Sequence, residues 1–199
     1  MRQKGAWDMQ DQPAPAKSVL EKYTHDLTAL ARQGRFAPLL RREKEVERVF
    51  QILARRLKNN PMLIGEDATE RFAIVAEVIR RISIGNVPDG ITFQRVVALD
   101  LEALIADTRI RGDLEKLLRS VIVEIRRSAG QVLLFVDQFH VLAGAGRAEN
   151  AIDMANILVP VLARGEARII GTSTLDDYRK YVERDAALQR RFQEILVSS

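Results

Sequence analysis

The sequence predicts an α/β domain in which helices cover both faces of a parallel sheet. Short, continuous apolar runs alternate with longer segments whose apolar residues recur at helical spacing. An apolar run without polar alternation is typical of a strand that is buried on both faces, as in parallel sheets. With 199 residues, 47% of them hydrophobic, the chain is long enough for one domain with a sizeable core.

The first residues predict a disordered leader. Residues 1–17 are mostly polar and include Pro13 and Pro15, so they offer little apolar surface to bury on folding. We expect a single domain to occupy residues 18–199.

Two helices are expected at the start of this domain. Ser18 is a favourable cap for a helix over 19–32, and Gly34 is a favourable residue to end it. The segment 43–57 repeats the helical spacing of apolar residues and predicts a second helix.

An alternation of strands and helices follows and sets the fold class. The expected elements are a strand over 62–65, a helix over 72–84 that opens near Thr69, a strand over 96–99, a helix over 113–127, a strand over 132–136, a helix over 152–163, a strand over 167–171, a helix over 175–182 and a last strand over 194–197. Ligands of such folds bind beyond the carboxyl ends of the strands. Residues 65–72, 137–138 and 172–174 are expected there.

The turn that begins at Gly65 has the layout of a phosphate-binding loop without its usual residues. In the pattern G-x-x-x-x-G-K-[ST], the second glycine falls on Glu70, the lysine on Arg71 and the hydroxyl residue on Phe72. Glycine allows backbone angles that a side chain resists, and Phe72 has no oxygen for magnesium. As an isolated motif, the segment is better interpreted as an ordinary strand-to-helix turn.

The composition argues against several classes of function. Although 31 Lys and Arg face 27 Asp and Glu, the basic residues are spread along the chain in pairs, so no nucleic-acid partner is expected. The chain has no cysteine, and His25 and His140 alone cannot form a histidine-based metal site, so no metal is expected. No apolar run reaches the length of a membrane span and no signal-peptide core is present, which favours a cytoplasmic location without a membrane partner.

Further motifs identify a family that the chain resembles. They are Leu20–Thr28, Lys58–Pro61, Asp137–His140, Gly144–Gly146, Leu162–Gly165, Gly171–Arg179 and Asp185–Phe192. Together they resemble the first ATPase domain of the Clp family of AAA+ unfoldases and disaggregases, over residues 20–197. The resemblance implies a three-layer P-loop NTPase fold, ATP and magnesium as the ligands of active members, assembly into rings, and protein clients.

The resemblance assigns roles to residues at the strand ends. If nucleotide binds, Gly65, Arg71, Asp137 and Thr174 are expected to contact it. Asp137 matches the acid that orients magnesium, and Thr174 matches the sensor of the terminal phosphate. Gln138 stands where active relatives have the glutamate that activates water, and a neutral amide cannot accept a proton. No catalytic residue is therefore expected.

Two further segments match functional motifs of the family. Arg190 and Arg191 match the arginine pair that reaches into the nucleotide site of a neighbouring subunit. The residues that match the loop of the central pore are Arg109, Ile110, Arg111 and Gly112. Ile110 replaces the aromatic residue that the family carries in this loop.

Each matching residue also has a structural interpretation. Asp137 can bond to nearby backbone, Thr174 can cap the helix that follows it, and His140 can pack in the core. Arg190 and Arg191 can form surface ion pairs, worth roughly 0 to 1 kcal/mol each. Because the phosphate loop is altered, the structural interpretation is favoured for Asp137 and Thr174. For the two arginines, the structural and the functional interpretation are equally favoured.

The replaced residues are those that a subunit uses for its own nucleotide, while the arginines lent to a neighbour are kept. We therefore expect a catalytically inactive domain without a cofactor, acting as a protein-binding, adaptor or structural module alongside an active Clp ATPase or a client. The alternative is a domain that binds ATP through Arg71 and hydrolyses it weakly or not at all. An active motor is the least favoured interpretation.

The position of the last expected strand bears on assembly. The sequence stops at Ser199, shortly after this strand, so the helical lid subdomain is expected to be absent. This argues against a ring of the usual kind, unless the sequence is part of a longer protein.

Overall fold

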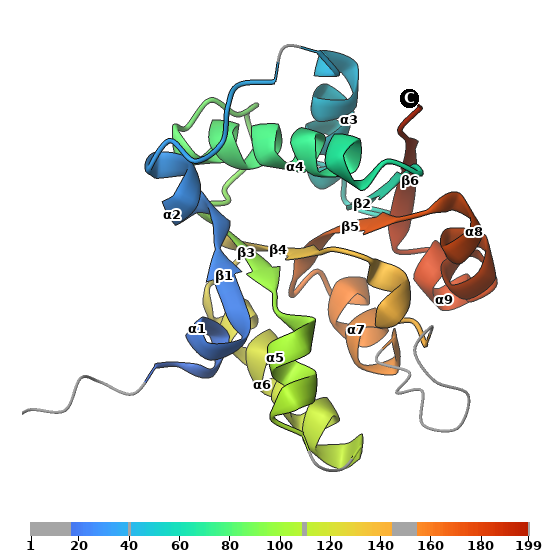
Figure 1. Cartoon of the computed structure of the whole chain (residues 1–199). Coiled ribbons are helices and arrows are strands. Elements are labelled where there is room, and N and C mark those ends of the chain that lie inside the picture. The colour runs from blue at the N-terminus through green and yellow to red at the C-terminus, as the bar shows by residue number, and fades with distance from the viewer. Residues whose placement is uncertain (1–16, 40, 109–110, 145–154, 199) are drawn as a thin grey trace, which may run out of the picture.

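A six-stranded sheet forms the centre of the molecule in the computed structural model, which describes residues 17–39, 41–108, 111–144 and 155–198 (Figure 1). The strands are β1 (Thr24–Asp26), β2 (Asn60–Ile64), β3 (Arg95–Leu99), β4 (Val132–Val136), β5 (Arg168–Ser173) and β6 (Phe192–Leu196). Their order is β1-β3-β4-β5-β2-β6, and every neighbouring pair is parallel except β1 with β3. The predicted α/β class with a parallel sheet is confirmed.

Helices lie on both sides of this sheet. They are α1 (Val19–Tyr23), α2 (Leu27–Arg32), α3 (Glu43–Leu53), α4 (Ala68–Ser83), α5 (Leu101–Ala106), α6 (Arg111–Arg127), α7 (Ala155–Ala163), α8 (Leu175–Asp177) and α9 (Ala186–Gln189), with a 3-10 turn η1 (Phe139–Val141) and a π-helical turn η2 (Tyr178–Glu183). Figure 1 shows α2, α3 and α4 on one face, and α1, α5, α6 and α7 on the other. The three layers match the predicted architecture.

The strands divide their side chains between two hydrophobic clusters, one on each face. In β4, Leu134 belongs to the cluster with α6 and α7, whereas Leu133 and Phe135 belong to the cluster with α3 and α4. All five residues of β4 are buried, because successive side chains of a strand point to opposite faces and both faces are covered. This explains the apolar runs without alternation in the sequence.

The predicted helix over 19–32 is wrong in its middle, where β1 separates α1 from α2. Ser18 caps α1 as predicted, and its hydroxyl accepts a hydrogen bond from the N–H of Glu21 (3.2 Å). The chain then extends at Thr24 to pair with β3, and Asp26 caps α2 by accepting from the N–H of Ala29 (2.9 Å). The apolar residues at helical spacing belong to two separate helices, α1 and α2. Between them, pairing with β3 outweighs the helical preference of the three residues of β1.

The predicted helix over 43–57 is too long, since α3 ends at Leu53. The side-chain amide of Asn59 donates to the carbonyls of Arg55 (3.3 Å) and Arg56 (3.1 Å), and the chain turns into β2 there. Leu57, the last residue of the predicted helix, is 74% exposed.

The other predicted strands lie in place, with ends shifted by a few residues. The short helix α5 was not predicted; Asp100 caps it by accepting from the N–H of Ala103 (2.8 Å). The predicted helix over 175–182 is instead α8 followed by the π-helical turn η2. Residues 1–16 and 152–154, in the predicted leader and the predicted start of α7, lie outside the described residues.

Candidate functional site

The carboxyl ends of β2, β4 and β5 meet at one edge of the sheet and bring together the residues predicted there. β5 lies between β4 and β2, so Gly65, Asp137 and Thr174 follow neighbouring strands. The N–H of Gly65 donates to the carbonyl of Ser173 (3.2 Å). Arg71 also points to this edge, since its guanidinium donates to the carbonyl of Gly65. The four residues expected to contact nucleotide thus share one region.

The N-terminus of α4 is capped by an acid of its own turn. Asp67 is the cap residue, and its carboxylate accepts hydrogen bonds from the N–H groups of Thr69 (2.7 Å) and Glu70 (3.2 Å). A carboxylate at this position also interacts favourably with the helix dipole. The helix therefore begins directly after Asp67 rather than near Thr69. An aspartate just before a helical pattern is the sequence signal for this cap. Two of the N–H groups that could hold an external anion are occupied.

Gly65 is held in close contact with Val197, the residue that follows the last strand. A Cβ on this residue would lie 2.5 Å from the carbonyl oxygen of Val197, closer than side-chain atoms approach backbone. The N–H of Val197 in turn donates to the carbonyl of Ile64 (2.7 Å). Gly65 is thus required by packing against residue 197, independently of any phosphate.

Arg71 is buried rather than directed into solvent. Only 4% of the residue is exposed, and its Nη1 donates to the carbonyl of Gly65. Its Nε is buried and has no hydrogen-bond partner within the part of the chain that the structure describes. The guanidinium therefore ties the end of β2 to the first turn of α4.

Glu70 and Phe72, which replace the second glycine and the hydroxyl residue, are both engaged in tertiary contacts. The carboxylate of Glu70 forms an ion pair with Arg42, for which the sequence predicted no role. The ring of Phe72 contacts those of Phe36 and Phe135, with centroids 6.0 and 6.2 Å away, although the residue is 39% exposed. The first helical turn is fixed by these contacts.

Asp137 and Gln138 form a small network with β5. The hydroxyl of Thr172 donates to the carboxylate of Asp137, and the N–H of Gln138 donates to the same hydroxyl (3.1 Å). Both residues are exposed, and Gln138 has a left-handed backbone conformation with φ of 50°. Thr172 lies in the stretch predicted at this edge, but its role was not predicted. This contact of Asp137 is with a side chain, whereas the structural interpretation named nearby backbone, so the role of Asp137 stays a prediction.

Thr174 makes the capping contact that the structural interpretation gave it, whereas His140 is partly buried beside polar groups rather than packed in a hydrophobic cluster. The hydroxyl of Thr174 caps α8 by accepting from the N–H of Asp177 (3.2 Å). The ring of His140, whose side chain is 13% exposed, stacks on Tyr181 at 6.4 Å and lies 3.6 Å from the carboxylate of Asp177. Among the described residues, no group of three or more His, Asp or Glu side chains is arranged to hold a metal ion.

Arg190 and Arg191 lie apart from this region. They precede β6, which runs parallel to β2, so they stand at the opposite edge of the sheet, where the amide of Asn60 donates to the carbonyl of Arg191 (2.9 Å). Across the four described ranges, neither guanidinium has a hydrogen-bond or ion-pair partner, and the Nε of Arg191 is buried. Surface ion pairs therefore do not explain these two residues.

The residues that match the pore loop are described only in part. Arg109 and Ile110 lie outside the described residues, and Arg111 and Gly112 form the start of α6.

Comparison with known proteins supplies the context for this geometry. No family model matches the chain. The chain is 48% identical to the chaperone protein ClpB 1 of Thermosynechococcus vestitus and 49% identical to the chaperone protein ClpB of Bdellovibrio bacteriovorus, over 98% and 94% of its residues. Its fold matches Hsp104 in a closed-state cryo-EM reconstruction with ATPγS and FITC-casein, with a TM-score of 0.80 and 41% identity over 92% of this chain.

The chain carries an AAA+ domain of the Clp family. Its match spans 22% of each of these two ClpB proteins and 31% of the Hsp104 chain. The Clp resemblance seen in the motifs is confirmed by these alignments, and the six-stranded sheet agrees with the AAA+ fold of Hsp104. The roles of individual Clp site residues stay predictions. No helix in the described ranges combines the length and hydrophobicity needed to cross a membrane.

Proposed function

We propose that this chain provides a catalytically inactive Clp-type AAA+ domain that works without nucleotide, as a protein-binding, adaptor or structural module. Its partner would be an active Clp ATPase or a client protein in the cytoplasm, and residues 18–199 would act as one domain. The observation that carries the proposal is the internal cap of α4. Asp67 already occupies N–H groups that would otherwise face a phosphate.

The charge of the loop supports this proposal. Glu66 and Asp67 add two carboxylates to the loop, and a carboxylate 4 Å from a phosphate near a surface would cost on the order of 1 to 4 kcal/mol. Arg71 is the one cation of residues 65–72, and its guanidinium is already bound to the carbonyl of Gly65. Binding of a triphosphate would require these contacts to rearrange.

The residues expected to act in hydrolysis support it as well. Phe72 has no oxygen to offer magnesium, and its ring contacts two other rings. Gln138 replaces the family's glutamate, and loss of an acid–base group alone reduces rates by roughly 100 to 10,000-fold. Binding and turnover are thus impaired by different residues, so a single compensating contact would not restore activity.

Isothermal titration calorimetry of the purified chain with MgATP, together with a phosphate-release assay, tests the proposal. We expect no binding heat and no turnover. A micromolar affinity for ATP would overturn the claim of nucleotide independence.

A restored variant provides the matched control. Arg71→Lys, Phe72→Thr and Gln138→Glu together replace residues of the loop and of the acid position with those of the family pattern. ATP affinity that appears only in this variant would locate the defect in these residues. Continued absence of binding would locate it elsewhere in the domain, for instance in the cap formed by Asp67.

A second candidate is a domain that binds ATP as a structural ligand and hydrolyses it weakly or not at all. It is supported by Asp137 and Thr174 at the same strand edge as Arg71, and by the similarity to Hsp104 solved with ATPγS. Thermal denaturation separates the candidates, because a ligand at 100 times its dissociation constant adds roughly 2.7 kcal/mol of stability. An unchanged melting temperature with MgATP favours the first candidate.

The two arginines support a role beside an active subunit. Arg190 and Arg191 lack partners in the described ranges and stand at the edge opposite the chain's own loop. In a mixed assembly they would reach a neighbour's nucleotide. Light scattering of this chain mixed with an active ClpB, with and without MgATP, tests the idea; co-assembly is expected, and Arg190→Ala with Arg191→Ala should lower the mixture's ATPase rate without preventing co-assembly.

A further inference from the structure

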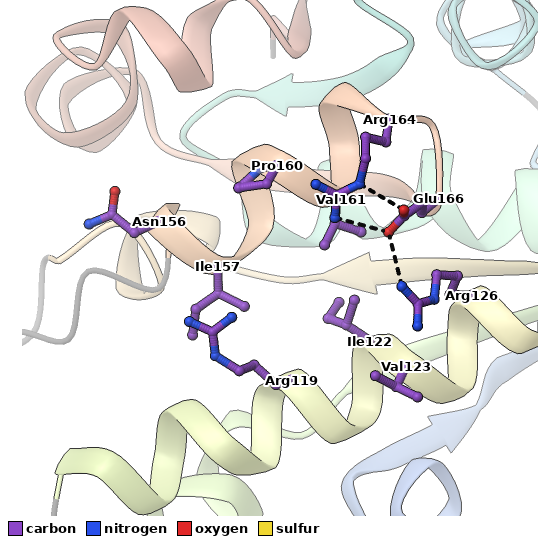
Figure 2. A pocket seen from close by; sticks show the side chains of 10 residues that line it. All are labelled: Arg119, Ile122, Val123, Arg126, Asn156, Ile157, Pro160, Val161, Arg164 and Glu166. Carbon is purple, nitrogen blue, oxygen red and sulfur yellow. Dashed lines mark hydrogen bonds and ion pairs between the residues drawn. The ribbon is translucent and has the colours of Figure 1, made fainter.

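A cavity of about 220 Å³ lies between α6 and α7, on the face of the sheet opposite α4 (Figure 2). Its wall is apolar and comes from both helices. Ile122 and Ile157 are each only 4% exposed, and Val161 is 8% exposed. The volume suits one aliphatic side chain and is smaller than the roughly 300 to 1,000 Å³ of sites that hold cofactors or drug-sized ligands.

The border of this α6–α7 cavity carries more positive than negative charge. Three guanidinium groups border it, from Arg119, Arg126 and Arg164, together with the single carboxylate of Glu166. Glu166 is bound through both oxygens by Arg164, at 2.7 and 3.2 Å, and lies 3.8 Å from Arg126. One carboxylate therefore serves two of the three guanidiniums.

Arg119 is the guanidinium that is left over. Within the part of the chain that the structure describes, its side chain has no hydrogen-bond or ion-pair partner, and the residue is exposed. Figure 2 shows this side chain extending from α6 toward Ile157 of α7. A carboxylate held by Arg119 would thus lie beside the apolar wall.

We propose that the α6–α7 cavity docks an acidic segment of a partner protein, with an aliphatic side chain against Ile122 and Ile157 and a carboxylate on Arg119. The inference rests on the proposed function as a protein-binding module and names its docking surface. Excess positive charge next to an apolar wall matches a peptide that carries both kinds of group. A nucleic acid would satisfy the arginines but offers no aliphatic group for the wall.

Fluorescence anisotropy with a short labelled peptide, a leucine flanked by glutamates, tests the proposal on the full chain. We expect saturable binding that weakens with salt, and binding about tenfold weaker for the same peptide with glutamines. Arg119→Glu is expected to weaken binding by about tenfold or more. Arg127→Glu is the matched control, since this residue is on the same helix, is exposed and does not line the cavity; it should bind as the unmodified chain does.

A second variant tests the apolar half of the site. Val123→Trp places a large side chain at the cavity while leaving the arginines in place, and it should abolish binding. Circular dichroism and the melting temperature report whether each variant is folded. Because Arg119 and Arg127 are exposed, both charge variants are expected to fold.

Several results would overturn the docking surface. These are failure of the unmodified chain to bind the acidic peptide, equal binding by Arg119→Glu and the unmodified chain, and full binding by folded Val123→Trp. Tighter binding of a single-stranded oligonucleotide of equal charge would also overturn it. Calorimetry with MgATP tests the proposed function separately: ATP binding overturns nucleotide independence, whereas loss of peptide binding without ATP binding overturns the docking surface alone.

Discussion

Two regions at opposite edges of the sheet differ in how their polar groups are satisfied. Between β2 and α4, N–H groups bind Asp67 and the guanidinium of Arg71 binds the carbonyl of Gly65. Between α9 and β6, the guanidiniums of Arg190 and Arg191 have no partner among the described residues. Changes in the first region should therefore reduce stability, and changes at the exposed Arg190 in the second should affect only contacts with other molecules.

The largest expected effect is a loss of stability at low pH, and it arises at Glu77 of α4, the helix whose N-terminus belongs to the first region. The carboxylate of Glu77 is 3% exposed and accepts hydrogen bonds from Arg80 (2.8 Å) and Arg81 (2.9 Å), which together with the N–H of Leu39 lower its pKa from 4.5 to about 2, Arg80 contributing most. Because its pKa is lower in the folded state, ionised Glu77 stabilises the fold at pH values above the unfolded-state pKa of 4.5. This stabilisation is lost as the pH falls toward 2. The loss should reach about 3 kcal/mol.

Urea unfolding between pH 6 and pH 2.5 measures this effect. The matched variant Glu77→Gln cannot ionise, so its stability should fall less steeply below pH 4.5. Identical slopes for the two proteins would show that other carboxylates carry the acid sensitivity. The result would also distinguish the contribution of Glu77, in the body of α4, to stability from that of the N-terminal turn.

The second effect concerns the contact between Gly65 and Val197. Gly65→Ala would place a Cβ 2.5 Å from the carbonyl of Val197, and such overpacking costs about 1 to 3 kcal/mol. Gly34→Ala is the control, because Gly34 has a φ of 73° but open space around its Cβ position, so only backbone strain of about 1 kcal/mol is expected. In denaturant unfolding, the free energy of unfolding of Gly65→Ala should be lower than that of Gly34→Ala. The reverse order would contradict the close contact.

The third effect concerns Asp67, the residue that caps α4. Asp67→Ala should destabilise the fold by about 1 kcal/mol, because two N–H groups of α4 lose their acceptor. Asp67→Asn keeps an acceptor oxygen and should cost less. Thermal unfolding of the three proteins with increasing sulfate provides the measurement, and the alanine variant should gain the most stability from the anion. Equal sulfate responses would mean that the cap does not exclude anions.

The smallest effect is expected in the second region. Arg190→Ala should change the free energy of unfolding by no more than about 0.5 kcal/mol, since its exposed guanidinium has no partner in the described ranges. A loss above 1 kcal/mol in urea unfolding would show that this residue stabilises its own chain. The contrast between the two regions would then fail.

The sequence predicted the layers and most strands because the apolar runs of the sheet are buried on both faces. It also brought residues 65, 137 and 174 to one edge, because parallel strands share the direction of their carboxyl ends. It did not predict β1, whose three residues are extended by pairing with β3 rather than by their own preference. The ion pair of Arg42 with Glu70 and the ring contacts of Phe72 were not predictable either, since they join segments distant in the chain.

The place of β2 between β5 and β6 has a consequence for synthesis of the chain. β2 emerges early from the ribosome, yet its partners β5 and β6 are translated much later. Until then its two edges are unpaired, and nascent β2 is exposed to pairing with other chains. The fold therefore depends on non-local contacts, which predicts slow closure of the sheet and a need for protection of the nascent chain by chaperones that bind extended apolar segments.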